Sequence, residues 1–218
     1  MDILSIKDVY YKVGNTDIIN GISIDIEEGD CISLVGQSGS GKSTLLKLIA
    51  DLIPISEGRI FFKGKDYSSL NPLDLRKKIS YCTQNAYLFG ENVYENLYFP
   101  FKLRNKDMDE KKIIDLLERF SLDRSYLEKS VNSLSGGEKQ RVGIIRNLLF
   151  TPEIILLDEA TSALDKENAY KVEEYIKDVN DRGATVLWIT HDLNQSTRIF
   201  NKRIVVSEGK VDRIEVIK

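Results

Sequence analysis

The chain has 218 residues, of which 42% are hydrophobic and 30% are charged, and its formal net charge is -3. This length and apolar content predict one α/β domain, at most with an inserted subdomain, and the weakly acidic balance argues against a nucleic-acid partner. No basic N-terminal region leads into an apolar stretch, and no apolar run reaches the roughly eighteen residues of a membrane span. We therefore expect a cytosolic chain that does not cross a membrane by itself.

The first predicted elements are two antiparallel strands. Leu4 and Ile6 lie in the first strand, a turn falls at Gly14-Asn15, and alternating apolar residues from 22 to 26 mark the second strand. A short buried strand over 31–35 begins with Cys31, and the other cysteine, Cys82, lies in a later predicted strand. We expect both cysteines to serve as small apolar residues rather than as disulfide partners or metal ligands.

A glycine-rich stretch follows and carries the clearest chemical signal of the chain. Its residues are Gly36, Gln37, Ser38, Gly39, Ser40, Gly41, Lys42, Ser43 and Thr44. Glycines let the backbone turn tightly, so that successive N–H groups converge on an anion without a Cβ in the way. The strand over 31–35 precedes this stretch and a helix is predicted over 43–51, which is the context that a phosphate-binding P-loop requires.

The groups of this loop have distinct predicted tasks. Lys42 reaches the β- and γ-phosphates of a nucleotide, the Ser43 hydroxyl is placed to ligate Mg²⁺, and the helix N-terminus adds partial positive charge. Many unrelated proteins share such a loop, so alone it indicates only the binding of a nucleoside triphosphate. Tyr10 and Tyr11 lie on the first strand, where an aromatic ring either stacks on the nucleotide base or fills the strand, and both interpretations stay open.

The sequence changes character after Gln84. Strands are predicted over 59–62 and 79–83, and Gln84 closes the second of them. From 85 to 151 apolar residues recur at helical spacing, which predicts a helical insertion. Residues 87–101 hold many of the chain's aromatic side chains, which either pack in a core or form an exposed docking patch.

A second glycine-containing segment lies in this insertion. Residues 134–141 read Leu-Ser-Gly-Gly-Glu-Lys-Gln-Arg and precede a helical pattern. Ser135 and Glu138 fit a capping box at the start of that helix. A capped helix start does not explain Gly136 and Gly137, which cost helix stability but let an anion approach the backbone closely.

Two carboxylates follow the next buried strand. The apolar residues 154–157 predict a parallel strand buried on both faces, and Asp158 and Glu159 stand at its C-terminal end, where ligands bind in doubly wound sheets. We expect Asp158 to hold Mg²⁺ and Glu159 to orient an attacking water or accept its proton.

The C-terminal part continues the alternation of helix and strand. Asp165 or Ser162 caps a helix that ends at Gly183, and a buried strand over 184–190 leads to His191, the only histidine. The position of His191 beyond a strand end favours contact with the γ-phosphate or its water over a structural role. Two final strands flank a turn at 208–209.

In this order the elements resemble the nucleotide-binding domains of ABC transporters, and the resemblance covers essentially the whole chain. Its most specific part is the segment 134–141, the ABC signature, which generic P-loop kinases lack. The resemblance implies an α/β fold with a P-loop NTPase (RecA-like) core, a mostly parallel sheet, an N-terminal antiparallel β subdomain and an inserted α-helical subdomain. The core and antiparallel subdomain would occupy 1–84 and 152–218, and the helical subdomain 85–151, within one domain.

The resemblance also implies roles for individual residues, with ATP and Mg²⁺ as the bound groups. The catalytic residues are Lys42, Gln84, Glu159 and His191. The magnesium ligands are Ser43, Gln84 and Asp158. The nucleotide contacts are Tyr11, with Tyr10 as its rival, residues 36–44, Ser135, Gly136, Gly137 and Asp165.

The partners follow from the same resemblance. Two chains pack head to tail on ATP binding, so that each ATP lies between the P-loop of one chain and the signature of the other. Hydrolysis drives a separate membrane permease, which places the chain at the inner face of the cell membrane. Stretches around Gln84 and over 186–192 are most similar to the bacterial iron-export ATPase subunits of the FetA type. A soluble ABC ATPase of the metal-cluster assembly type stays open as an alternative.

Overall fold

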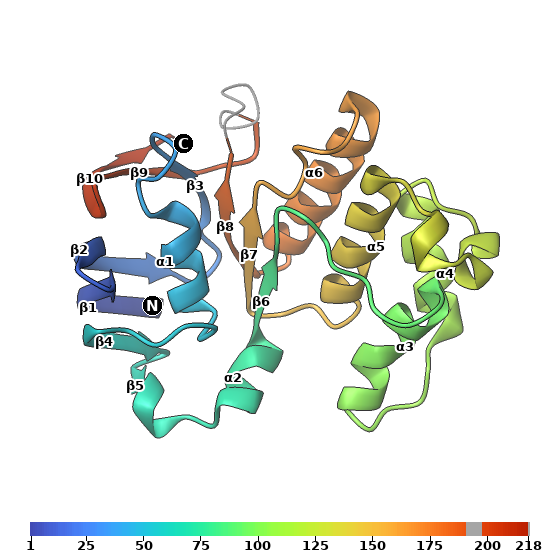
Figure 1. The fold of residues 1–218 in the computed structure, drawn as a ribbon, viewed down its shortest axis with the longest axis horizontal. Helices are drawn as coiled ribbons and strands as arrows, with labels where there is room; N and C mark the ends of the chain where they lie inside the picture. The colour runs from blue at the N-terminus through green and yellow to red at the C-terminus, as the bar shows by residue number, and fades with distance from the viewer. Residues whose placement is uncertain (191–197, 218) are drawn as a thin grey trace. The chain divides into compact units, whose positions relative to one another are not determined.

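The computed structural model describes residues 1–190 and 198–217, which divide into two compact units. The sheet unit comprises Met1–Tyr81, Pro152–Asp158 and Val179–Lys218, and the helical unit comprises Cys82–Thr151 and Glu159–Asp178. The elements of each unit are labelled in Figure 1. The domain limits drawn above from the sequence stay a prediction.

An antiparallel sheet opens the sheet unit and confirms the predicted N-terminal strands. Its strands are β1 (Asp2–Val13), β2 (Thr16–Glu27), β4 (Glu57–Phe62) and β5 (Lys65–Asp66), in the spatial order β2-β1-β4-β5. The β1–β2 hairpin closes over a two-residue turn, because Val13 faces Thr16 and Gly14 has a φ of 59°. Such a turn favours glycine, which adopts a positive φ without strain.

A six-stranded sheet forms the rest of the sheet unit. Its strands are β3 (Cys31–Val35), β6 (Ile79–Cys82), β7 (Ile154–Asp158), β8 (Thr185–Ile189), β9 (Lys202–Ser207) and β10 (Lys210–Val216), in the order β10-β9-β3-β8-β7-β6. The pairs β3–β8, β3–β9 and β7–β8 are parallel, and only the β9–β10 hairpin is antiparallel among the pairs described (Figure 1). Every residue of β7 and β8 is buried, which explains their continuous apolar sequences.

Helix α1 (Lys42–Ile49) joins the core that both sheets share. Its buried leucines and isoleucine belong to one apolar cluster with side chains from β1, β2, β3, β7 and β8. The short helices η1 (Tyr67–Ser69) and α2 (Pro72–Lys78) follow β5 and are capped by Asp66 and Asn71. Cys31 and Cys82 are buried and are not joined in a disulfide.

The helical unit confirms the predicted run of helices. It holds α3 (Val93–Leu103), α4 (Glu110–Arg119), η2 (Arg124–Glu128), η3 (Val131–Ser133), α5 (Gly136–Leu148) and most of α6 (Lys166–Asp181). Asn92 caps α3 and Asp109 caps α4, while Ile113, Leu116 and Leu117 form the buried face of α4. None of the helices in the described parts of the chain has the length and apolar character of a membrane-spanning segment.

Candidate nucleotide site

The P-loop lies between β3 and α1, and its glycines are imposed by the chain itself. Gly36 has a φ of 149°, and a Cβ at this position would lie 2.0 Å from the carbonyl oxygen of Val206. Gly41 has a φ of 99°, and a Cβ there would lie 2.9 Å from the carbonyl oxygen of Ile18. A side chain at either position would both strain the backbone and collide with it.

The N-terminus of α1 is left for a ligand. Gly41 stands at its N-cap position, and no side chain in the described part of the chain caps the helix. The first N–H groups of a helix need partners from outside the helix, and their partial positive charge favours an anion. Gln37, Ser38 and Gly39 are exposed at the tip of the loop, and Ser43 and Thr44 are half-buried at the start of α1.

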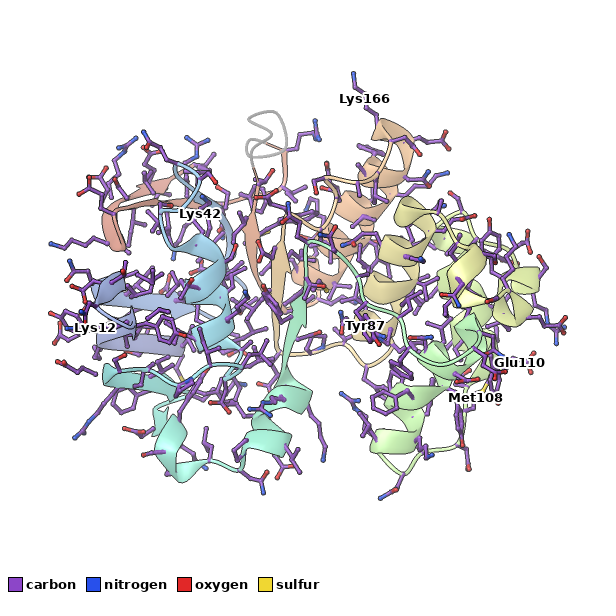
Figure 2. All side chains as sticks on the ribbon, in the orientation of Figure 1. Lys12, Lys42, Tyr87, Met108, Glu110 and Lys166 are labelled. Carbon is purple, nitrogen blue, oxygen red and sulfur yellow. The ribbon has the colours of Figure 1, made fainter. Side chains whose placement is uncertain are left out.

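Lys42 is the first residue of α1 (Figure 2), and its side chain contacts the loop before the helix. Its Nζ donates to the carbonyl oxygens of Gly36 at 2.9 Å and Gln37 at 2.8 Å, with the Ser40 hydroxyl at 3.4 Å, and the residue is 6% exposed. A buried ammonium is stable only when oxygen acceptors surround it. The loop carbonyl oxygens therefore hold the Lys42 ammonium next to the loop, whose backbone N–H groups are suited to bind phosphates.

Asp158, at the end of β7, is the predicted metal ligand of the sheet unit. The Ser43 hydroxyl donates to Asp158 Oδ1 at 3.0 Å, and the Tyr81 hydroxyl donates to Asp158 Oδ2 at 2.7 Å. The pair of Ser43 and Asp158 offers the hard oxygen ligands that Mg²⁺ prefers. No group of three or more His, Cys, Asp or Glu side chains in the described residues is arranged to hold a metal, and Mg²⁺ needs none because it keeps waters and phosphate oxygens as ligands.

Tyr81 is a site residue that the sequence did not reveal. It lies in β6, the strand next to β7 in the sheet, and its hydroxyl donates to the second carboxylate oxygen of Asp158. No motif marks it, because the contact depends on the pairing of two strands that lie far apart in the sequence.

Glu159 and Gln84 face each other in the helical unit. The Gln84 Nε2 donates to Glu159 Oε2 at 2.8 Å, and Glu159 has a φ of 48°. A non-glycine residue in this left-handed conformation is uncommon and typical of functional sites. Because Gln84 donates through its nitrogen, its side-chain oxygen stays directed elsewhere and is the only atom of the side chain suited to bind a cation.

The signature segment forms the capping box that the sequence predicts. The Glu138 N–H donates to Ser135 Oγ at 3.3 Å, and the Ser135 N–H donates to Glu138 Oε2 at 2.7 Å. The Tyr126 hydroxyl and the Ser135 N–H, in that order, lower the pKa of Glu138 to about 2, so this carboxylate is ionised at neutral pH.

Gly136 and Gly137 are not required by contacts within the chain. No described atom lies within 4 Å of a Cβ placed on Gly136, and the nearest neighbours of a Cβ on Gly137, Ala163 O and Leu164 Cδ2, lie at an ordinary 3.5 Å. Ser135 and Gly136 are exposed. Contacts with the described residues therefore do not explain why glycine stands at these two positions.

Asp165 caps α6 and is tied to the signature helix. Its carboxylate accepts from the Asn168 N–H at 2.9 Å and from Asn168 Nδ2 at 2.6 Å, and these bonds lower its pKa. Arg141 Nη1 donates to Asn168 Oδ1 at 2.6 Å and to the Phe120 carbonyl oxygen at 3.0 Å. Of the two predicted caps, Asp165 makes this N–H bond, and Ser162 is exposed in the preceding turn. Asn168 carries no motif signal in the sequence.

The remaining predicted residues are the aromatic base contact and the histidine. Tyr10 lies over Gly21, where a Cβ would come within 2.8 Å of its hydroxyl, and Tyr11 packs partly buried against the apolar core. Which of the two contacts a base stays open. His191 falls outside the described residues, and the strand that precedes it, β8, spans Thr185–Ile189 within the predicted range 184–190.

Comparison with known proteins shows the family of this chain. Residues 19–162 match the family model described as ABC transporter. A probable iron export ATP-binding protein, FetA, of Escherichia coli (strain K12) is 45% identical over 98% of this chain and 97% of its own length. An ergothioneine transport ATP-binding protein, EgtV, of Helicobacter pylori (strain G27) is 37% identical over 96% and 99%. The dimeric post-hydrolysis structure of the ATP-binding cassette MJ0796 with ADP and Pi has a TM-score of 0.89 at 31% identity, covering 99% of both chains.

The chain belongs to the ABC transporter family. Its fold is that of the ABC ATPase cassettes, with an antiparallel N-terminal sheet and a mostly parallel core sheet, as the sequence predicts. It is an ATP-binding subunit of that family, its reaction is ATP hydrolysis, and Mg²⁺ is the metal that the family implies.

Proposed function

We propose that this chain hydrolyses ATP at the interface of a head-to-tail homodimer and thereby drives a separate membrane permease that exports iron. The observation that supports the proposed dimer is the unoccupied space at the start of the signature helix α5. Gly136 and Gly137 leave room that no described residue fills, although glycine at a helix start costs stability. The γ-phosphate held by a second chain is the anion that this surface fits.

The residues of this chain divide the chemistry between them. The P-loop N–H groups and the Lys42 ammonium bind the phosphates and offset the charge that develops on the transferred phosphoryl group. Ser43 and Asp158 would hold Mg²⁺, which supplies further positive charge at the phosphates when it is bound. Glu159 orients the attacking water and accepts its proton. Gln84 holds the Glu159 carboxylate through the 2.8 Å hydrogen bond.

The permease contact is assigned to α3 and the segment before it. Tyr87, Tyr94, Tyr98, Phe99 and Leu103 are exposed, with Tyr87 at 78%. Tyr94 and Tyr98 stack with ring centroids 5.7 Å apart, while Val93, Leu97 and Phe101 on the same helix are buried. The aromatic segment is thus divided between buried core residues and exposed residues. An exposed aromatic face of this kind marks a docking surface, which would place the chain at the inner face of the membrane.

The cargo rests on the comparisons alone. The relative that is 45% identical is named for probable iron export, whereas a relative that is 37% identical over a similar share of its length is named for ergothioneine transport. The cargo does not touch an ATP-binding subunit, so no side chain of this site distinguishes iron from another substrate. The alternative function, a soluble ATPase for metal-cluster assembly, needs no permease and no exposed aromatic face on α3.

Co-purification from detergent-solubilised membranes of the native host tests the proposal. We expect a polytopic membrane protein to accompany the tagged chain and to be lost in a Tyr94→Ala, Phe99→Ala variant. The matched control is Tyr170→Ala, an exposed tyrosine on α6. Cells that carry Glu159→Gln should then accumulate iron above the wild-type level. Recovery of soluble proteins alone would favour the assembly ATPase, and unchanged cellular iron with an intact permease complex would contradict iron as the cargo.

A further inference from the structure

Tyr126 connects the short helix η2 to the start of the signature helix. It is half-buried, and its hydroxyl donates to Glu138 Oε1 at 2.5 Å. The other oxygen of that carboxylate, Oε2, accepts from the Ser135 N–H at 2.7 Å. One carboxylate thus spans from η2 to the residue that caps α5. A capping box needs only Ser135 and Glu138, so the tyrosine adds a hold on Glu138 that helix capping does not require.

The bond from Tyr126 is strong because its acceptor is charged. The Tyr126 hydroxyl is the largest cause that lowers the pKa of Glu138, ahead of the Ser135 N–H. Hydrogen bonds to an ionised carboxylate are shorter and about twice as strong as neutral ones. The Lys129 Nζ lies 3.3 Å from the centroid of the Tyr126 ring, and this cation–π contact holds the ring from its face.

The segment that carries Tyr126 is itself anchored. The Val93 N–H donates to the Lys129 carbonyl oxygen at 3.1 Å, and the Val131 N–H donates to the Glu91 carbonyl oxygen at 3.0 Å. An isolated β-bridge joins Asn92 and Ser130 between these two bonds. The backbone segment that carries Tyr126 is therefore attached to the N-terminus of α3. A side chain that positions another residue needs such a fixed backbone.

We propose that Tyr126 is a positioning residue for the signature: through Glu138 it fixes the orientation in which Ser135, Gly136 and Gly137 meet the nucleotide of a second chain. The inference rests on the proposed ATP-dependent dimer. Tyr126 belongs to the helical unit, whereas the P-loop belongs to the sheet unit. Loss of its hydroxyl should weaken ATP-driven dimerisation and leave the binding of ATP by the monomer unchanged.

The test uses the full chain with Glu159→Gln, which we expect to bind ATP and to hydrolyse it only slowly. In this background we compare Tyr126→Phe with the parent, measuring ATP affinity at chain concentrations below dimerisation and the dimer dissociation constant by analytical ultracentrifugation with ATP. We expect a dimer dissociation constant about tenfold higher for Tyr126→Phe, which is the effect of about 1.4 kcal/mol, and an unchanged monomer affinity. The matched control is Tyr67→Phe, which removes a hydroxyl bond of 2.9 Å to the Ile49 carbonyl oxygen in the sheet unit.

Thermal unfolding separates positioning from a structural role. Both tyrosine variants should lower the melting temperature by a similar small amount, but only Tyr126→Phe should weaken the dimer. In a Glu138→Ala background Tyr126→Phe should have no further effect, since the contact acts through that carboxylate. Two results would contradict the role of Tyr126 without contradicting the dimer. One is an unchanged dimer dissociation constant for Tyr126→Phe. The other is an effect of Tyr126→Phe in the Glu138→Ala background as large as its effect in the parent. A parent that stays monomeric with ATP would overturn the proposed dimer and this inference together.

Discussion

The two phosphate-binding segments of this chain use glycine for different reasons. In the P-loop, Gly36 and Gly41 have positive φ values, and any Cβ would strike the backbone of the same chain. In the signature, Gly136 and Gly137 have room for a Cβ. Contacts within one chain therefore explain Gly36 and Gly41, whereas for the signature glycines we propose a group from another molecule. A buried clash indicates a structural requirement, and unused space at a costly glycine indicates an interface.

The same two segments also differ in how their helices begin. Helix α1 has no side-chain cap in the described residues, and Lys42 donates to the loop carbonyl oxygens, so a bound phosphate would complete this helix start. Helix α5 has a complete capping box, reinforced by Tyr126. The first site depends on its ligand for satisfied backbone groups. The second is ordered before any ligand arrives, which suits a surface that must fit a partner.

The largest expected effect tests whether Glu159 acts in chemistry rather than in binding. Glu159→Gln keeps the shape of the side chain but removes its basicity, so we expect ATP turnover to fall by a factor of about 10² or more while ATP binding persists. A phosphate-release assay beside a nucleotide-binding titration measures both. The control is Glu174→Gln, which changes an exposed carboxylate on α6. Normal turnover in the Glu159 variant would move the base role to another residue.

The next effect tests the structural glycine of the P-loop. Gly36→Ala places a Cβ 2.0 Å from the Val206 carbonyl oxygen and forces the loop to shift. We expect the free energy of unfolding to fall by about 1–3 kcal/mol and ATP affinity to fall at least about tenfold. Urea denaturation and a nucleotide titration check the two effects. ATP binding at the wild-type affinity would show that the loop does not depend on this backbone conformation.

The third prediction tests the contrasting glycine of the signature. Gly137→Ala fits within the chain, so we expect stability to stay equal or to rise by up to about 1 kcal/mol, because alanine favours the helix. ATP binding by the monomer should be unchanged, but turnover should fall by about tenfold because the partner's phosphates meet the added methyl group. A destabilised monomer would place the reason for this glycine inside the chain and remove the contrast with Gly36.

The smallest effect concerns the charge that orders the signature. The pKa of Glu138 is lowered from its ordinary value of 4.5 to about 2, so the ionised form stabilises the fold fully above about pH 4.5 and this contribution is lost as the pH falls toward 2. The difference in unfolding free energy between the wild type and Glu138→Gln should be constant above pH 5 and shift against the wild type below pH 4.5. Urea denaturation at a series of pH values measures it. If the difference in unfolding free energy between the wild type and Glu138→Gln does not vary with pH, the ionised Glu138 carboxylate does not stabilise the fold.

The sequence predicted those parts of the site that local pattern determines. The P-loop, the capping box of Ser135 and Glu138, and the two carboxylates after β7 depend on neighbours within a few residues. Tyr81, Tyr126 and Asn168 were not predicted, because their roles arise from contacts with Asp158, Glu138 and Asp165 that only the folded chain provides. The choice between Ser162 and Asp165 as the cap of α6 likewise needed the hydrogen bonds of the structure.

Mixing two inactive variants is the most direct test of the claim that the P-loop and the signature act across two chains. Lys42→Ala disables the P-loop, and Gly137→Asp places a negative charge where the partner's phosphates should lie. Each variant alone should lack ATPase activity. A head-to-tail dimer of the two contains one site with an intact P-loop and an intact signature, so the mixture should hydrolyse ATP. If the mixture is as inactive as its components, although mixed dimers form, the two segments do not act across the chains and the account is contradicted.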